Sequence, residues 1–376
     1  MYPRDLQNQL SKWLERKEII ILYGARQVGK TTLITEMLKD LQDAAIYNCE
    51  RPDIKEILEN KNLPGIHLLF ENKKIVALDE AQKVADIGTI LKLIYDDDTF
   101  DQKIIATGSS SFELADTITE TLTGRNVKFR LYPLSMDEIR KKNGWLWVIE
   151  NIGQLLVYGT YPGIIDLPAS MKSIKLLELS SDYLFKDILA YDNIRNPSLL
   201  RKLLKSLALQ PGSQVSNHEL AGMLGVASAT IEKYLDLLEK CFVIFSLPSF
   251  SSNLRNEIRK SKKYYFYDLG IRNALIASFG NIENRSDIGA LWENYCIAER
   301  LKYNEIHHPG ASLYFWRTYD GAEIDLVEDY NGELQAFEFK WKPRKSHSFP
   351  ASFINEYHPV RCTFIAKNDI QKLIDK

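Results

Sequence analysis

The chain has 376 residues, of which 45% are hydrophobic and 26% are charged, values typical of a folded globular protein with two or three domains. Its formal net charge of −2 excludes a general attraction to nucleic acid or acidic membranes, so any such surface must be local. No apolar stretch approaches the ~20 residues that cross a bilayer, and the first residues do not have the pattern of a secretory signal, so we expect a cytoplasmic protein with no membrane partner. The four cysteines are not paired in spacing, so we expect reduced thiols and no zinc site.

A phosphate-binding loop follows the first predicted strand. The run 19–23 is entirely apolar, which is typical of a strand buried on both faces, and residues 24–31 then read GARQVGKT, a full G-x-x-x-x-G-K-[ST] match that opens a helix. Backbone N–H groups of such a loop surround phosphates, Lys30 would contact the β- and γ-phosphates, and Thr31 would hold Mg²⁺. Arg26 either contacts nucleotide or faces solvent. The predicted ATP-binding residues are Gly24, Ala25, Arg26, Gln27, Val28, Gly29, Lys30, Thr31 and Thr32.

A second apolar run, residues 75–78, ends in Asp79 and Glu80, about 50 residues after the loop. In a parallel sheet this ending places both carboxylates at the edge where nucleotides bind. We expect Asp79 to hold Mg²⁺ through water and Glu80 to polarise the water that attacks ATP. The sequence therefore predicts ATP and Mg²⁺ as cofactors.

A third strand, 103–107, precedes a run of serines, and strands at 44–47 and 127–131 complete a predicted five-stranded sheet. Ser109 would sense the γ-phosphate or orient the water, unless the serines are an ordinary turn. Arg125 would stabilise transition-state charge, in cis or across a subunit interface, or would form a structural salt bridge. The sequence is compatible with an oligomer and equally with a monomer.

These motifs, taken together, resemble a known family. GARQVGKT, LDEAQ, ATGSSS, LTGR followed by YPLSMDEI, YGTYPGII and YLFKDIL occur in the order found in bacterial and archaeal AAA-superfamily ATPases with a C-terminal restriction-endonuclease-like domain of unknown function. The resemblance covers about residues 4–190 and extends through the C-terminal pattern. It implies an additional-strand ATPase core with Asp79 and Glu80 as paired acids and Gln82 after them, and it supplies no settled physiological role.

The middle of the chain is predicted as two further units. Residues 135–195 are helical and would form a lid over the nucleotide, after an ATPase core at 1–134. Residues 196–263 read as helix, turn, helix and strand, the outline of a winged helix. Residues 249–263 carry a net charge of +4, whereas the candidate recognition helix is charge-balanced, so DNA backbone contact is expected unless this unit only packs between domains. The basic residues are Arg255, Arg259, Lys260, Lys262 and Lys263.

The C-terminal unit, residues 264–376, reads as helix, three strands, a helical or irregular piece and a last strand. Glu338 and Lys340 lie two apart and share one face of a strand, and Asp325 is a predicted cross-strand neighbour. Together with Glu293 on the helix, or less favourably Glu299, the carboxylates would bind Mg²⁺ and Lys340 would help to activate water for phosphodiester cleavage. Alternatively the carboxylates serve only salt bridges.

The predicted fold class is thus α/β, with a P-loop AAA-like core, a helical lid, a winged helix and a restriction-endonuclease-like domain. We expect an AAA-type ATPase that couples its nucleotide state to a DNA-interacting winged helix and a Mg²⁺-dependent nuclease-like site. The alternative is an ATP-dependent conformational switch whose nuclease-like domain is catalytically silent.

Overall fold

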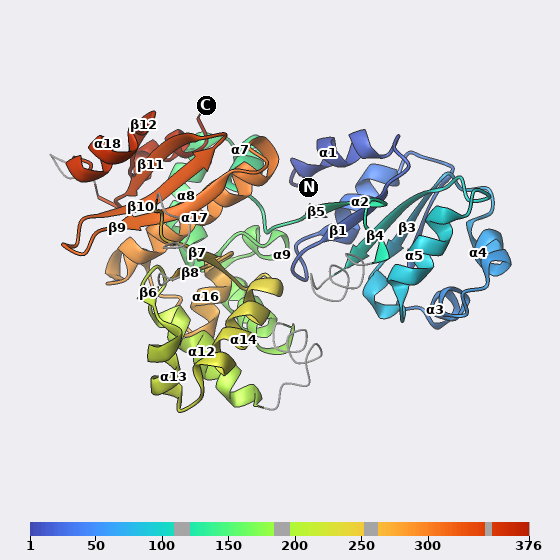
Figure 1. The fold of residues 1–376 in the computed structure, drawn as a ribbon, viewed down its shortest axis with the longest axis horizontal. Helices are drawn as coiled ribbons and strands as arrows, with labels where there is room; N and C mark the ends of the chain where they lie inside the picture. The colour runs from blue at the N-terminus through green and yellow to red at the C-terminus, as the bar shows by residue number, and fades with distance from the viewer. Residues whose placement is uncertain (109–120, 184–195, 252–261, 343–347, 376) are drawn as a thin grey trace.

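The protein folds into two lobes joined by its N-terminal segment and by the chain that leaves the first sheet (Figure 1). A computed structural model describes residues 1–108, 121–183, 196–251, 262–342 and 348–375. One lobe contains the first sheet, and the other contains nearly everything after it.

The first lobe is built on a five-stranded parallel sheet in the order β2-β3-β4-β1-β5. Strand β4 therefore lies between the strand that leads into the phosphate loop and the strand that ends at Asp79, as an additional-strand core requires. All five predicted strands are confirmed. Their bounds are β1 Ile19–Tyr23, β2 Ala44–Asn48, β3 Ile75–Asp79, β4 Lys103–Gly108 and β5 Asn126–Arg130.

Helices cover both faces of this sheet, which explains why its central strands are mostly apolar. One hydrophobic cluster joins the sheet to α3, α4 and α5, and another joins it to α1 and α2. In α5 the buried residues Ile87, Ile90, Leu91 and Ile94 recur at helical spacing. The helices are α1 Leu6–Trp13, α2 Lys30–Leu38, α3 Pro52–Glu59, α4 Leu63–Phe70 and α5 Ile87–Asp96, with a short turn of helix, η1, at Ala81–Lys83.

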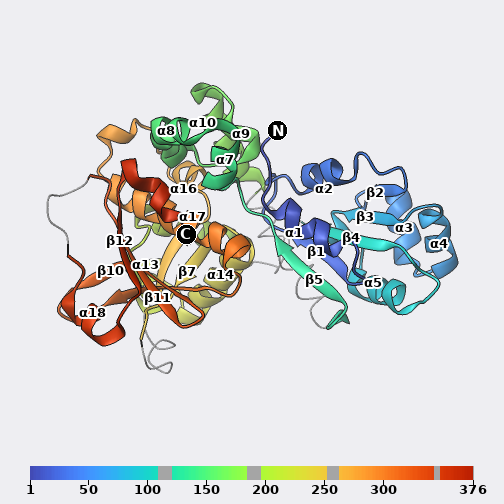
Figure 2. The same ribbon diagram turned by 90° about the horizontal axis from the view of Figure 1, so that it is seen from above.

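The predicted lid begins with a helix whose start is encoded locally. Ser135 caps α7 by accepting a hydrogen bond from the Glu138 N–H, and the Glu138 side chain accepts one from the Ser135 N–H, a reciprocal capping box. The described helices of this region lie beside α16 and α17 of the second lobe (Figure 2). They are α7 Met136–Asn143, α8 Trp145–Tyr158, α9 Pro162–Ile165, α10 Ala169–Glu178 and a π-helical segment, η2, at Leu179–Tyr183.

The next region contains two helices joined by a tight turn, followed by strands. Gly225, with a left-handed φ of 69°, ends the first of these helices. A small antiparallel sheet in the order β6-β8-β7 combines β6, which precedes these two helices, with β7 and β8, which follow them. The predicted boundary after residue 263 falls inside β8. The elements are α12 Pro197–Leu209, β6 Gln214–Val215, α13 Asn217–Leu224, α14 Ser228–Lys240, β7 Ile244–Leu247, β8 Lys262–Phe266 and α16 Leu269–Leu275.

The last region has the predicted order of helix, three strands, helix and strand. Its sheet runs β12-β11-β10-β9, with β9, β10 and β11 antiparallel and β12 parallel to β11. Two short 3-10 segments, η3 and η4, flank it. The elements are η3 Ile282–Asn284, α17 Ile288–His307, β9 Ser312–Arg317, β10 Glu323–Tyr330, β11 Glu333–Phe339, α18 Ala351–Tyr357, β12 Arg361–Ile365 and η4 Lys367–Leu373.

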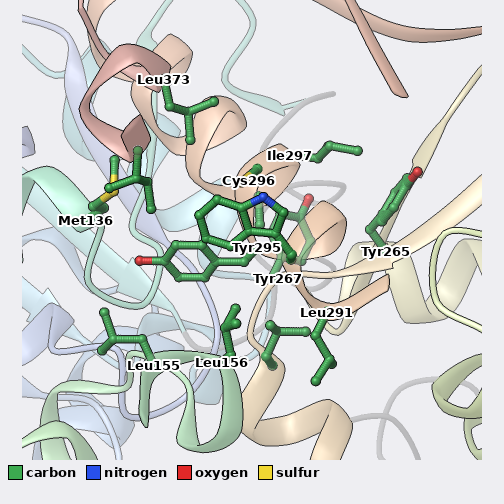
Figure 3. Packing of buried hydrophobic residues seen from close by; sticks show 14 of the residues in the cluster. Met136, Leu155, Leu156, Tyr265, Tyr267, Leu291, Tyr295, Cys296, Ile297 and Leu373 are labelled. Atoms are coloured by element: carbon green, nitrogen blue, oxygen red, sulfur yellow. The ribbon is translucent and has the colours of Figure 1, made fainter. Parts of the chain in front are cut away.

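One hydrophobic core joins the predicted lid to the regions after it. Met136 and Leu155 from the lid helices, Tyr265 from β8, and Tyr295 and Leu373 from the C-terminal region belong to the same buried cluster (Figure 3). The lid helices therefore share a core with the second lobe, and four residues of the lid region also belong to the hydrophobic cluster of α1, α2 and the first sheet: Tyr161, Ile164, Leu176 and Leu179.

Candidate functional site

The phosphate loop requires glycine at its first position. Gly24 has a φ of 154°, and a Cβ there would lie 2.1 Å from the carbonyl oxygen of Leu131. Gly29, with a φ of 98°, directly precedes α2. Lys30 opens α2 with a buried side chain, and its Nζ donates to the carbonyl oxygens of Gly24 and Ala25, each at 2.9 Å. The loop therefore already encloses an ammonium group.

Asp79 lies where the motif spacing predicted, at the carboxyl edge of the sheet. The Thr31 hydroxyl is 3.1 and 2.9 Å from its two carboxylate oxygens, and the Thr107 hydroxyl donates to Oδ1 at 2.5 Å. Hydroxyl and carboxylate oxygens are the ligands that Mg²⁺ prefers, so this donor set fits the ion. Sequence reasoning missed Thr107, although it ends the predicted third strand; Ser109, which was predicted instead, lies outside the described residues.

Glu80 adopts a backbone conformation that is rare for a residue other than glycine. Its φ is 55°, a left-handed value that is often found at functional sites. The Glu80 carboxylate accepts a hydrogen bond from Gln82 Nε2 at 2.6 Å, and the Glu80 N–H donates to the Thr107 hydroxyl at 3.3 Å.

Burial, together with the charges of Asp79 and Glu80, raises the pKa of the neighbouring Cys49 thiol to about 12, so this cysteine stays protonated.

A cavity of about 450 Å³ adjoins the loop. Its lining comes from three parts of the chain: Gly29, Thr32 and Leu33 at the start of α2, the N-terminal residues 1–4, and the lid residues Lys142, Pro162 and Asp166. The hydroxyl of Tyr2 donates to Asp166 at 2.6 Å across this cavity. The predicted lid therefore reaches the nucleotide region through these side chains.

Arg125 is not brought to this site. It precedes β5, and its carbonyl accepts a hydrogen bond from the N–H of Ile19, the first residue of β1, at 2.9 Å. That is the amino edge of the parallel sheet, opposite the phosphate loop. The guanidinium is paired with Asp96, with Nε–Oδ1 at 2.7 Å and Nη2–Oδ2 at 3.1 Å. A role in cis is contradicted by this placement, and the structural salt bridge is observed.

The predicted C-terminal residues do come together. Lys340 Nζ lies 3.1 Å from Asp325 Oδ2 and 2.7 Å from Glu338 Oε2, and the N–H of Phe339 donates to Asp325 at 2.8 Å. The pairing of β10 with β9 shifts by one residue between Ile324 and Val327, the interval that contains Asp325. A β-bulge, which is one form of such a shift, re-aims side chains next to sites. Burial and the charge of Asp325 raise the pKa of Glu338 to about 7.

Glu293 forms its own ion pair with a residue that was predicted elsewhere. Lys263 Nζ lies 3.3 Å from Glu293 Oε1 and 2.5 Å from Glu323 Oε1, and the Tyr265 hydroxyl donates to Glu293 at 2.7 Å. Lys263 is only 3% exposed, so its assignment to a DNA-facing basic wing is wrong. Of the other predicted wing residues, Lys262 is exposed, whereas Arg255, Arg259 and Lys260 lie outside the described residues.

Glu299 does not substitute for Glu293. Its carboxylate accepts a hydrogen bond from the N–H of Met136, the first residue of α7, and pairs with Lys302 at 2.8 Å. Within the described residues, three acidic or histidine ligand atoms come within 4.8 Å of one another only at Asp5, Asp137 and His307, outside the C-terminal cluster. Lys263 pairs with Glu293 and Glu323, and Lys340 pairs with Asp325 and Glu338. A metal ion could bind these carboxylates only if they moved closer to one another.

The raised pKa of Glu338 predicts a pH-dependent stability. The ordinary carboxyl pKa is 4.5 and the folded value is about 7, so the protonated side chain favours the folded state below about pH 4.5, and this contribution is lost as pH rises to about 7. We expect the Glu338→Gln variant to gain stability relative to wild type over that window. Urea unfolding of both proteins at several pH values measures this, and a difference that does not change with pH would contradict it.

Comparisons with known proteins divide the chain into three matched regions. Residues 16–140 match an AAA domain, residues 149–287 match a domain of unknown function (DUF8612), and residues 288–374 match another (DUF4143). The third region begins at the first residue of α17. The first lobe is therefore an ATP-binding P-loop domain of the AAA type.

Similar whole proteins come from bacteria and archaea. An uncharacterized protein of Mycobacterium tuberculosis is 28% identical over 341 residues, which is 90% of this chain and 73% of that protein. One from Methanocaldococcus jannaschii is 26% identical over 369 residues, which is 86% of this chain and 76% of that protein.

A Walker-type ATPase of Pyrococcus abyssi has a similar solved structure, with a TM-score of 0.51, 18% identity, and coverage of 73% of this chain and 96% of that one. This likeness concerns the fold.

In the part of the chain that the structure describes, no helix is both long and apolar enough to cross a membrane.

Proposed function

We propose that this protein hydrolyses ATP in its first lobe and uses the nucleotide state to reorganise the second. The observation that carries the proposal is the buried Lys30 ammonium, held by the loop carbonyl oxygens of Gly24 and Ala25 beside the pair Thr31 and Asp79. An ammonium group held on carbonyl oxygens can exchange them for the more strongly charged phosphate oxygens of ATP. Backbone N–H groups of residues 24–32 would bind the remaining phosphate oxygens.

Each recurring part of phosphoryl transfer has a candidate residue in this site. Thr31 and Asp79 would hold Mg²⁺, which when bound supplies positive charge at the phosphates. Glu80 would orient and polarise the attacking water once its carboxylate leaves Gln82. Thr107 is hydrogen-bonded to both Asp79 and the Glu80 N–H, and it would hold the two acidic residues in fixed positions relative to each other. The adjacent cavity would take the base and ribose.

The assignment of Glu80 leads to a specific prediction. Glu80→Gln keeps the size of the side chain but removes the charge that polarises water, so hydrolysis should fall by roughly 10²–10³-fold while ATP still binds. Nucleotide that remains on the protein after rapid desalting should then be ATP rather than ADP.

The matched control is Glu50→Gln, an exposed glutamate just after the neighbouring strand β2. It should hydrolyse ATP at the wild-type rate. Normal turnover by Glu80→Gln would remove Glu80 from the mechanism.

We further propose that the C-terminal cluster is the site of a Mg²⁺-dependent phosphodiester cleavage. The convergence of Asp325, Glu338 and Lys340, with Glu293 nearby, supports it. Lys340 would help to activate water, and the carboxylates would hold the ion after Lys263 or Lys340 moves. The alternative, a silent domain in which the lysines neutralise the carboxylates, is supported by the same salt bridges, and it makes the protein an ATP-dependent switch.

DNA contact would come from the middle region. The helix pair α13 and α14, together with the small sheet in which β6 precedes the pair and β7 and β8 follow it, supports its interpretation as a winged helix. The exposed Lys262 and the basic residues 255, 259 and 260 would contact the DNA backbone. We also propose a cytoplasmic location, an oligomer in which Arg125 acts on a neighbouring subunit, and a C-terminal restriction-endonuclease-like domain.

A further inference from the structure

We propose that Arg4 is a positioning residue that sets the shape of the phosphate loop and ties it to the start of α7. The inference rests on the proposed ATP site. Arg4 lies in the N-terminal segment before any motif of the ATPase core. Its side chain nevertheless runs behind the loop, and it is 9% exposed.

The guanidinium of Arg4 makes three hydrogen bonds to three separate parts of the chain. Nη1 donates to the carbonyl oxygen of Val28 at 2.7 Å, and Nη2 donates to that of Tyr132 at 2.6 Å. Nε donates to Glu138 Oε1 at 3.0 Å. Because the guanidinium is planar and rigid, these bonds fix the relative positions of all three partners.

The bond to Val28 acts at a sensitive point of the loop. Val28 is fully buried and precedes Gly29, whose left-handed φ turns the chain into α2 and Lys30. A Cβ built on Gly29 would lie 3.7 Å from Arg4 Nη1. Arg4 therefore holds the carbonyl oxygen of Val28 on the far side of the loop, so that the following N–H groups are left to face the phosphates.

Glu138 is itself held rigidly on α7. Its Oε1 also accepts a hydrogen bond from the N–H of Asp5 at 3.0 Å, and its Oε2 accepts one from the N–H of Ser135 at 3.0 Å. The Glu138 side chain is 6% exposed, so loss of its charge would leave a buried guanidinium uncompensated. The position of Arg4, and hence of the loop, depends on where α7 begins.

The start of α7 is also bound by α17, which lies in the same lobe as α7. The Glu299 carboxylate of α17 accepts a hydrogen bond from the N–H of Met136 at 2.5 Å, and Lys302 Nζ donates one to the carbonyl oxygen of Leu134 at 3.3 Å. Residues 134–138 are thus contacted by Arg4 on one side and by α17, which also carries Glu293, on the other. A change in the loop on nucleotide binding would act on this junction through Arg4.

The test compares two buried arginine–glutamate pairs of the full chain by their effect on the dissociation constant for ATP with Mg²⁺. The Arg4–Glu138 pair is measured through Arg4→Met and Glu138→Gln. The control pair is Arg300–Glu328, also buried, with Nε–Oε2 at 2.6 Å and located between α17 and β10 away from the loop. It is measured through Arg300→Met and Glu328→Gln.

We expect Arg4→Met to weaken ATP binding about tenfold or more, because a charge-assisted contact to the loop is lost. Glu138→Gln should weaken it by roughly threefold or more, since the guanidinium loses its charged partner but keeps the loop contact. The control variants should lower the melting temperature yet bind ATP within about twofold of wild type.

Wild-type affinity in both Arg4→Met and Glu138→Gln would overturn the proposal, as would an equal loss in the control pair, because general destabilisation would then explain it. Should Arg4→Met or Arg300→Met fail to fold, the milder Glu138→Gln and Glu328→Gln variants decide the question by the same criterion. A wild-type chain that binds no ATP would refute the proposed function itself, which is a distinguishable result.

Discussion

Lys30→Ala should reduce ATP hydrolysis by roughly 10²–10³-fold, the typical effect of deleting one preorganised charge that stabilises a transition state. The Lys30 ammonium is buried inside the loop, where it donates hydrogen bonds to the carbonyl oxygens of Gly24 and Ala25. Alanine removes the charge that would neutralise the β- and γ-phosphates, and no rearrangement of the loop backbone replaces it. Release of inorganic phosphate under saturating ATP measures the effect.

A second lysine near the same helix provides the control. Lys39 follows the last residue of α2 and pairs with Glu36 on the surface at 2.5 Å. Lys39→Ala should hydrolyse ATP at the wild-type rate, since surface ion pairs of this kind contribute little. If Lys30→Ala turned over ATP as fast as Lys39→Ala, the nucleotide site would have been assigned to the wrong loop.

Asp325→Ala should abolish nicking of plasmid DNA by the purified protein in Mg²⁺ or Mn²⁺. Asp325 lies at the centre of the C-terminal cluster, where its Oδ2 accepts hydrogen bonds from the Phe339 N–H and from Lys340. Without it the cluster loses both a metal ligand and the group that orients Lys340. Conversion of supercoiled plasmid to the open circular form gives the rate.

The control for this variant is Asp320→Ala, an exposed position in the turn between β9 and β10. It should nick DNA at the wild-type rate. If wild type and Asp325→Ala leave plasmid equally intact across metals and nucleotides, the carboxylates serve salt bridges only, and the switch with a silent C-terminal domain becomes the better account.

The ATP-binding lobe could be predicted well because its signals are local. The central strands β1, β3 and β4 contain short apolar runs, and the loop motif directly encodes the turn at Gly24 and the placement of Lys30. The position of Asp79 follows from the rule that parallel strands end at one edge. The meeting of Asp325, Glu338 and Lys340 was likewise predictable from the two-residue period of strands.

The sequence could not predict contacts between segments far apart in the chain. Lys263 belongs to a basic run that indicates a solvated surface, and only the fold places it against Glu293. Arg4 stands outside every motif, and its partners lie up to 134 residues away. Arg125 was wrongly predicted to lie near the nucleotide, because its loop motif does not indicate which edge of the sheet the loop occupies. The lid helices share a core with the second lobe because their apolar faces match partners that no local pattern identifies.

Calorimetric titration of the full chain with ATP in the presence of Mg²⁺ tests the central claim most directly. The account predicts saturable binding at one site, and strongly weakened binding in Lys30→Ala. A wild-type chain that takes up no nucleotide at millimolar concentrations, or one that binds it equally well after Lys30→Ala, would contradict the account.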